Sequence, residues 1–167
     1  MEYTLIRSNR KTVSISINDD LLVLVKAPLL LDKDKINDFV ESNEAWILKA
    51  IAQKKKVLEK YEQADTKELA DKAKEYIPNR IKYYTDLMGL KPSSVKITSA
   101  KKRFGSCSGK NSVCFSYYLM LYPLEAVDYV IVHELAHIKY HNHSRDFYSL
   151  ISKYMPDYKD REKLLKE

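Results

Sequence analysis

The sequence predicts an α+β fold, in which a histidine-bearing helix packs on a small antiparallel or mixed sheet after an N-terminal β-hairpin and a helical segment. Two observations support this prediction. Residues 124–138 contain no Gly or Pro, and their apolar side chains recur at the three- and four-residue spacing of a helix. Val13, Ile15 and Ile17 instead alternate with polar residues, which is the period of a strand buried on one face.

The first part of the chain is expected to form strands and then helices. Residues 2–28 predict strands, with a turn at residues 18–20, where Asn-Asp-Asp interrupts the apolar alternation. Residues 32–40 predict a short helix, and Ser42-Asn43 predict the cap of a longer one. We expect the longer helix to bury an apolar face made of Trp46, Ile47, Ala50, Ile51 and Val57.

A polar stretch at residues 63–66 is the best candidate for a linker. It divides the chain into an N-terminal lobe, residues 1–65, and a second domain, residues 66–167, unless the two form one continuous domain. The length of 167 residues is enough to bury a sizeable core.

The second part begins with a predicted helix at residues 67–88, which Thr66 caps and Gly89 ends. Proline lacks the backbone N–H and clashes with the preceding turn, so Pro78 should kink or divide this helix. A short strand is predicted at residues 95–98.

The region around the histidines combines a loop, a strand and further helices. Residues 101–111 predict a basic loop that holds two of the three glycines, and residues 112–121, rich in Val, Phe and Tyr, predict a strand. Ser144 should cap an amphipathic helix that ends before Pro156. Residues 161–167 predict a short charged helix.

Composition narrows the cellular setting. No stretch is long and apolar enough to span a membrane, and the N-terminus lacks the features of a signal peptide. Two cysteines, Cys107 and Cys114, do not make a disulfide framework. We therefore predict a cytoplasmic protein with no membrane partner. The sequence carries no signal for an oligomeric state.

All four histidines lie within residues 133–143, where His133-Glu134-Leu135-Ala136-His137 matches the H-E-x-x-H signature of zinc peptidases. Two histidines four residues apart lie on one face of a helix, one turn apart, and can bind one zinc ion. Glu134 is displaced around the helix, so we expect it to take a proton from a zinc-bound water rather than to bind the metal.

A catalytic zinc needs a third protein ligand, and the candidates are His141 and His143. On a continuing helix His141 would lie about 12 Å along the axis from His133, too far to converge with it. His143 can converge if the helix ends near Tyr140 and Asn142 turns the chain. We therefore predict one zinc ion per chain, held by His133, His137 and His143.

The sequence resembles the YgjP-like metallopeptidases, small zincin relatives of the SprT- and WLM-type peptidases. The resemblance is carried by Phe104-Gly105-Ser106-Cys107-Ser108, by His-Glu-Leu-Ala-His, by Asn142-His143-Ser144 with Phe147, and by Pro156-Asp157-Tyr158. It implies a zincin-like domain with zinc on His133, His137 and His143, and Glu134 as the base. Phe104 stands where the family's glycine motif usually begins with Trp.

The resemblance also implies a peptide or protein substrate. In zinc peptidases of this architecture an edge strand near the zinc pairs with an extended substrate, and we assign residues 112–121 to this role by resemblance. A second electrophile should assist the reaction, and Tyr158, Tyr140 and Arg145 are candidates among which the sequence does not choose. Asp128 and Asp146 are candidate partners for the ligand imidazoles, but we leave both outside the predicted site.

Two other functions compete with peptide hydrolysis. A net charge of +6 and the basic clusters Lys54-Lys55-Lys56 and Lys101-Lys102-Arg103 suit contacts with phosphates. The alternative is thus a DNA-associated zinc protease, or a nucleic-acid-binding module in which the zinc is structural. Because activated water attacks other bonds as well, a non-peptidase hydrolase is the third hypothesis.

Overall fold

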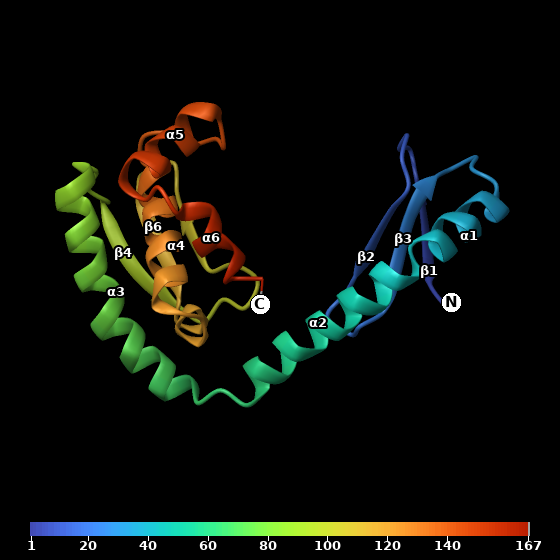
Figure 1. The fold of residues 1–167 in the computed structure, drawn as a ribbon, viewed down its shortest axis with the longest axis horizontal. Helices are drawn as coiled ribbons and strands as arrows, with labels where there is room; N and C mark the ends of the chain where they lie inside the picture. The colour runs from blue at the N-terminus through green and yellow to red at the C-terminus, as the bar shows by residue number, and fades with distance from the viewer. Residues whose placement is uncertain (167) are drawn as a thin grey trace. The chain divides into compact units, whose positions relative to one another are not determined.

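A computed structural model describes residues 1–166 and divides the chain into two compact units, Met1–Gln63 and Ala64–Glu167 (Figure 1). Each unit has its own apolar core. Among the described residues, no helix is both long enough and apolar enough to cross a membrane. The last residue of the predicted C-terminal helix, Glu167, lies outside the described residues.

The first unit is a three-stranded mixed sheet followed by two helices. The strand order is β1-β3-β2, with β1 parallel and β2 antiparallel to β3. The predicted hairpin is therefore formed by β2 and β3, and β1 adds to its other side. The elements are β1 Thr4–Ser8, β2 Ser14–Ile17, β3 Val23–Pro28, α1 Lys33–Ser42 and α2 Glu44–Glu62.

The apolar face of α2 is narrower than the sequence predicted. Ile47 is fully buried against the core of the first unit, with Ile51 partly buried beside it, whereas Trp46 is 52% exposed. Successive helix positions differ by about 100° around the axis, so Trp46 cannot share the direction of Ile47. The prediction that Trp46 points inward was wrong.

The second unit begins with the long helix α3, Thr66–Met88. Its cap is Asp65, whose side chain accepts hydrogen bonds from the backbone N–H groups of Lys67 and Glu68, rather than the predicted Thr66. The helix runs through Pro78 without being divided. Gly89 ends it in the left-handed conformation at φ 68°, as predicted.

The sheet of the second unit has the order β4-β6-β5, with β4 parallel and β5 antiparallel to β6. These strands are β4 Ser94–Thr98, β5 Gly105–Cys107 and β6 Ser112–Ser116. Two predictions fail here. Residues 101–111 are not loop throughout, because they contain β5, and β6 is a central strand rather than an edge.

The predicted strand 112–121 is cut short by Ser116. Its side chain accepts a hydrogen bond from the backbone N–H of Tyr118 and donates one to the carbonyl of Ala100. These bonds turn the chain into a 3-10 helix, η1 Tyr117–Leu121. The predicted strand is therefore a strand followed by a helical turn.

Three helices complete this unit: α4 Leu124–Ala136, α5 Arg145–Tyr154 and α6 Tyr158–Lys163. Helix α4 is buried almost all round, with all residues from Ala126 to Val132 and again from Glu134 to Ala136 inside. A helix that is apolar on every side is one that neighbours cover. Helix α6 begins before the predicted residues 161–167.

Candidate metal centre

The C-terminal end of α4 places two histidines side by side. The Nε2 atoms of His133 and His137 lie 3.2 Å apart, and their rings are 4.9 Å apart between centroids. The four-residue spacing on the helix produces this approach. The buried residues around them, including the fully buried Leu135 and Ala136, hold this end of the helix in the core.

A tight turn then brings His143 back to the helix end. The helix stops at Ala136, whose carbonyl accepts hydrogen bonds from the N–H groups of Lys139 and Tyr140. Ser144 caps α5 by accepting a hydrogen bond from the N–H of Phe147. His143 lies between the end of α4 and the start of α5, and its side chain points back to α4. Its Nε2 atom lies 3.1 Å from Nε2 of His133.

The three imidazole nitrogens lie close enough together to hold a metal ion. One donor atom from each of His133, His137 and His143 lies within 4.8 Å of the others. Around a tetrahedral zinc with bonds of about 2.0–2.1 Å, ligand nitrogens stand about 3.3–3.4 Å apart. Nε2 of His133 lies 3.2 Å from that of His137 and 3.1 Å from that of His143, and both separations are close to this value. His141 is not part of the cluster.

The other ring nitrogens have partners that orient the imidazoles. His137 donates from Nδ1 to the carbonyl oxygen of Tyr140 at 2.9 Å, because a carbonyl only accepts, and this leaves a lone pair on Nε2. Nδ1 of His133 lies 3.4 Å from the hydroxyl of Tyr129, one helical turn earlier. Neither partner is one of the aspartates considered from the sequence.

The ring of Phe147 packs against all three imidazoles. Its ring centroid lies 4.9 Å from that of His133, 4.4 Å from that of His137 and 5.0 Å from that of His143. The side chain is fully buried. Because the Ser144 cap fixes the first turn of α5, it also fixes Phe147 and through it the rings.

Burial makes the histidines suitable as neutral ligands. It lowers the pKa of His133 to about 4, with smaller contributions from the neighbouring His137 and His143. Burial likewise lowers the pKa of His137. Metal binding requires unprotonated imidazole, so both rings have their lone pairs available at neutral pH.

Glu134 is a buried carboxylate, and β5 packs directly against it. The residue is 7% exposed, and this burial raises the pKa of its carboxyl group to about 7. A methyl group added to Gly105 would stand 2.8 Å from Cγ of Glu134 and 3.0 Å from its Oε1. The glycine therefore leaves the space that the carboxylate occupies.

A cleft of about 340 Å³ joins these groups. Its walls are the three clustered histidines, Glu134, His141, Arg103 and the residues of β5. Cys107 lies in this wall, and burial, followed by the nearby charge of Glu134, raises the pKa of its thiol. The thiolate is thereby disfavoured, in agreement with a structural cysteine.

None of the three predicted candidates for a second electrophile lines the metal cleft. Arg145 and Tyr158 line a different cavity, on α5 and α6, and Tyr140 contributes its backbone carbonyl to His137. The cation in the wall of the metal cleft is Arg103. Sequence reasoning counted Arg103 only as part of a basic cluster, although its position two residues before Gly105 was a usable signal.

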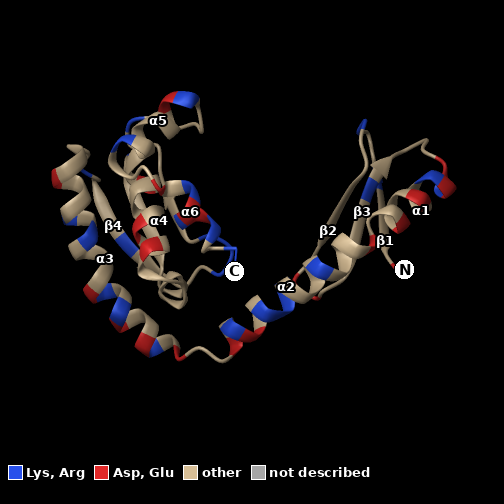
Figure 2. Cartoon of the chain, viewed as in Figure 1, with Lys and Arg blue, Asp and Glu red and all other residues tan. Residues whose placement is uncertain are grey.

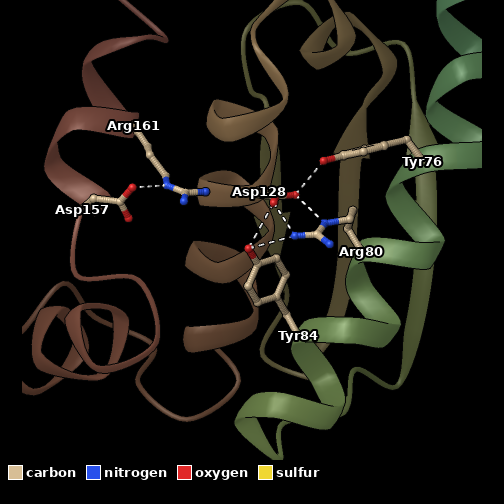
Figure 3. A network of polar contacts seen from close by, with 6 residues as sticks. All are labelled: Tyr76, Arg80, Tyr84, Asp128, Asp157 and Arg161. Carbon is tan, nitrogen blue, oxygen red and sulfur yellow. Dashed lines mark hydrogen bonds and ion pairs between the residues drawn. The ribbon is translucent and has the colours of Figure 1, made fainter.

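Asp128 holds α4 against α3 rather than orienting a histidine (Figure 3). Its carboxylate accepts hydrogen bonds from the guanidinium of Arg80, at 2.6 and 2.9 Å, and from the hydroxyls of Tyr76 and Tyr84. The buried carboxylate is thus fully partnered, as an internal charge must be. Burial and the charge of Asp128 raise the pKa of Tyr76 to about 12.

Together the H-E-x-x-H helix, the small mixed sheet and the three-histidine cluster define a zincin-like α+β metallopeptidase domain, as predicted. The sequence model of the YgjP-like metallopeptidase domain matches residues 11–70 and 54–167. This match covers most of the chain, and the chain belongs to the YgjP-like metallopeptidase family.

One solved structure is similar to part of the chain. The zymogen of abylysin, a metallopeptidase of Pyrococcus abyssi, is 23% identical, with a TM-score of 0.49, over 53% of this chain and 90% of that one. None of the curated proteins matches the chain.

Proposed function

We propose that the protein is a zinc-dependent peptidase in which Glu134 acts as the general base on the attacking water. The observation that carries this proposal is the convergence of three imidazole nitrogens beside a buried carboxylate in one cleft. In this proposal His133, His137 and His143 would hold one zinc ion per chain. Bound there, it supplies a Lewis acid that polarises the carbonyl and lowers the pKa of water to about 7.

Glu134 is suited to carry the proton. A base must accept a proton from water and return it to the leaving amine, which is easiest when its pKa lies near the working pH. The raised pKa of about 7 places Glu134 in that range. Its position beside β5 keeps the carboxylate next to the cleft rather than in the ligand cluster.

Substrate enters along β5 in this proposal, which replaces the earlier assignment of residues 112–121. Strand β6 lies between β4 and β5, so both of its sides are already paired. Within residues 1–166 strand β5 pairs with β6 alone, and it lines the cleft. An extended peptide can add to such an edge through main-chain hydrogen bonds, which favours unfolded segments over a defined sequence.

Arg103 takes the role of the second electrophile. A guanidinium in the cleft wall can donate hydrogen bonds to the oxyanion that develops as the scissile carbonyl is attacked. It makes no hydrogen bond or ion pair with any residue in the part of the chain that the structure describes. Its donors are therefore available to a substrate.

No observation favours the nucleic-acid alternative to the same degree. Lysines and arginines alternate with acidic residues along α2 and α3 (Figure 2). Lys54 is paired with Asp19 at 2.9 Å, and Lys55 lies 4.0 Å from Glu59, so the lysine cluster is partly neutralised. Stimulation of proteolysis by DNA tests this hypothesis directly.

The test of the proposed function is hydrolysis of an unfolded protein, such as casein, by the zinc-loaded chain. We expect Glu134→Gln to keep the zinc and to lose at least about 100-fold in rate, because an amide cannot accept the proton. Wild-type turnover by this variant would remove Glu134 from the role. A wild-type chain that binds zinc but cleaves no unfolded protein would contradict the proposal itself.

A further inference from the structure

A second cavity, of about 530 Å³, opens between α5 and the start of α6. All five residues that line it carry a hydrogen-bond donor in the side chain, and none carries a carboxylate. They are Arg145, Tyr148, Ser149, Ser152 and Tyr158. A cavity with one guanidinium and four hydroxyls is chemically suited to an anion.

These donors are not used by the fold. No side-chain hydrogen bond or ion pair joins any of the five to another residue within residues 1–166. The acid nearest in sequence to Tyr158 is Asp157, which is paired with Arg161 at 2.8 Å (Figure 3). Asp146 follows Arg145 but does not line the cavity. The guanidinium of Arg145 therefore has no competing carboxylate in the cavity wall.

Tyr148 connects this cavity to the metal centre. Its ring stacks on that of His143, with centroids 6.2 Å apart, and on that of Tyr158, with centroids 6.0 Å apart. One side chain thus separates the third metal ligand from the cavity. An extended peptide advances about 3.3 Å per residue, so a peptide at the metal centre reaches the cavity within a few residues.

We propose that this cavity is a substrate subsite that binds a carboxylate of the peptide, with Arg145 as the residue that selects it. The inference rests on the proposed peptidase function and adds a substrate preference to it. Arg145 pairs with the carboxylate through parallel N–H groups, and the tyrosine and serine hydroxyls complete the shell. A net charge of +6 favours the approach of acidic chains.

The experiment compares synthetic peptides that carry glutamate or glutamine at each position around the scissile bond. We expect the glutamate peptide to be preferred at one position, and Arg145→Gln to lower its kcat/KM by about tenfold or more. The glutamine peptide should be unaffected. Lys153→Gln is the matched control, since it removes a cation from the same helix outside the cavity.

The carboxylate can come from a side chain or from the C-terminus of the peptide. Peptides with free and amidated C-termini separate the two sources. If amidation of the C-terminus lowers the rate and the exchange of glutamate for glutamine does not, the subsite binds the chain end. Equal rates for all four peptides, or an equal loss in Arg145→Gln and Lys153→Gln, would overturn the subsite.

Binding without turnover separates this inference from the proposed function. In zinc-loaded Glu134→Gln, the same peptides are titrated by fluorescence anisotropy, and Arg145→Gln is added to that background. We expect about tenfold weaker binding of the glutamate peptide alone. This result supports the subsite even if the wild type cleaves nothing, whereas unchanged affinity overturns it even if the wild type is an active peptidase.

Discussion

Gly105 and Glu134 occupy complementary space: a Cβ on Gly105 would lie 2.8 Å from Cγ of Glu134, and 3.1 Å from Cγ1 of Val130. Real Cβ atoms do not approach a neighbour as closely as 2.8 Å. The φ angle of Gly105 is not in the left-handed region, so the backbone alone does not require glycine there. The requirement comes from the carboxylate that lies against β5.

Gly105→Ala should therefore impair catalysis without removing the metal. The methyl group displaces the Glu134 side chain, and a shift of about 1 Å in a catalytic group costs on the order of 100-fold in rate. Gly109→Ala is the matched control, because a Cβ there meets nothing within 4 Å. Rates and zinc content of both variants check the prediction. Equal activities of the two variants would contradict it.

The buried carboxyl of Glu134 should also affect stability in the metal-free protein. Its pKa is raised from 4.5 to about 7, so the folded state holds a proton that the unfolded state releases in this range. At a pH below the pKa of Glu134 in the unfolded state, the contribution of this protonated carboxyl to stability is fully present. That stability is lost as pH rises through the window from about 4.5 to 7, by on the order of 3 kcal/mol.

Glu134→Gln isolates this effect, since His133 acts in the opposite direction. Because the pKa of His133 is lowered to about 4, its contribution to the stability of the fold is lost as the pH falls. This loss is the same in the wild type and in Glu134→Gln. We expect metal-free Glu134→Gln and wild type to be equally sensitive to urea near pH 4.5, and the variant to be the more stable near pH 8. A stability difference that does not change with pH would exclude burial of the charge as the cause.

The third ligand is tested by a pair of histidine variants. His143 lies 3.1 Å from His133 between their Nε2 atoms, whereas His141 lines the cleft outside the cluster. His143→Ala should weaken zinc binding by several kcal/mol, and His141→Ala by much less. Competition with a chelator measures both affinities. A larger loss in His141→Ala would mean that the third ligand is misassigned.

Local signals were enough to predict the histidine region. The periodicity of residues 124–138 predicted α4, and Ser144 predicted the start of α5. His143 returns across the helix end through a turn, as its spacing from His133 and His137 predicted. These features depend on neighbours close in sequence, so the sequence carries them directly.

The features that were missed depend on long-range pairing. Strand β5 has three residues, Gly105–Cys107, whose polar and flexible composition is typical of a loop, and only its pairing with β6 makes it a strand. Which strand forms the edge follows from that pairing. The role of Asp128 likewise depends on Arg80 and Tyr84, more than forty residues away in sequence.

Arg103 lies two residues before β5 and lines the cleft beside it, so its place also depends on the pairing of this strand. If its guanidinium stabilises the oxyanion, Arg103→Ala should lower kcat by about 100-fold or more while zinc affinity stays unchanged. Arg103→Lys should restore part of this loss, since an ammonium keeps the charge without the planar pair of donors. Lys110→Ala removes an exposed cation from the turn after β5, outside the cleft, and serves as the control. An increase in KM with normal kcat would instead mean that Arg103 binds the ground state of the substrate.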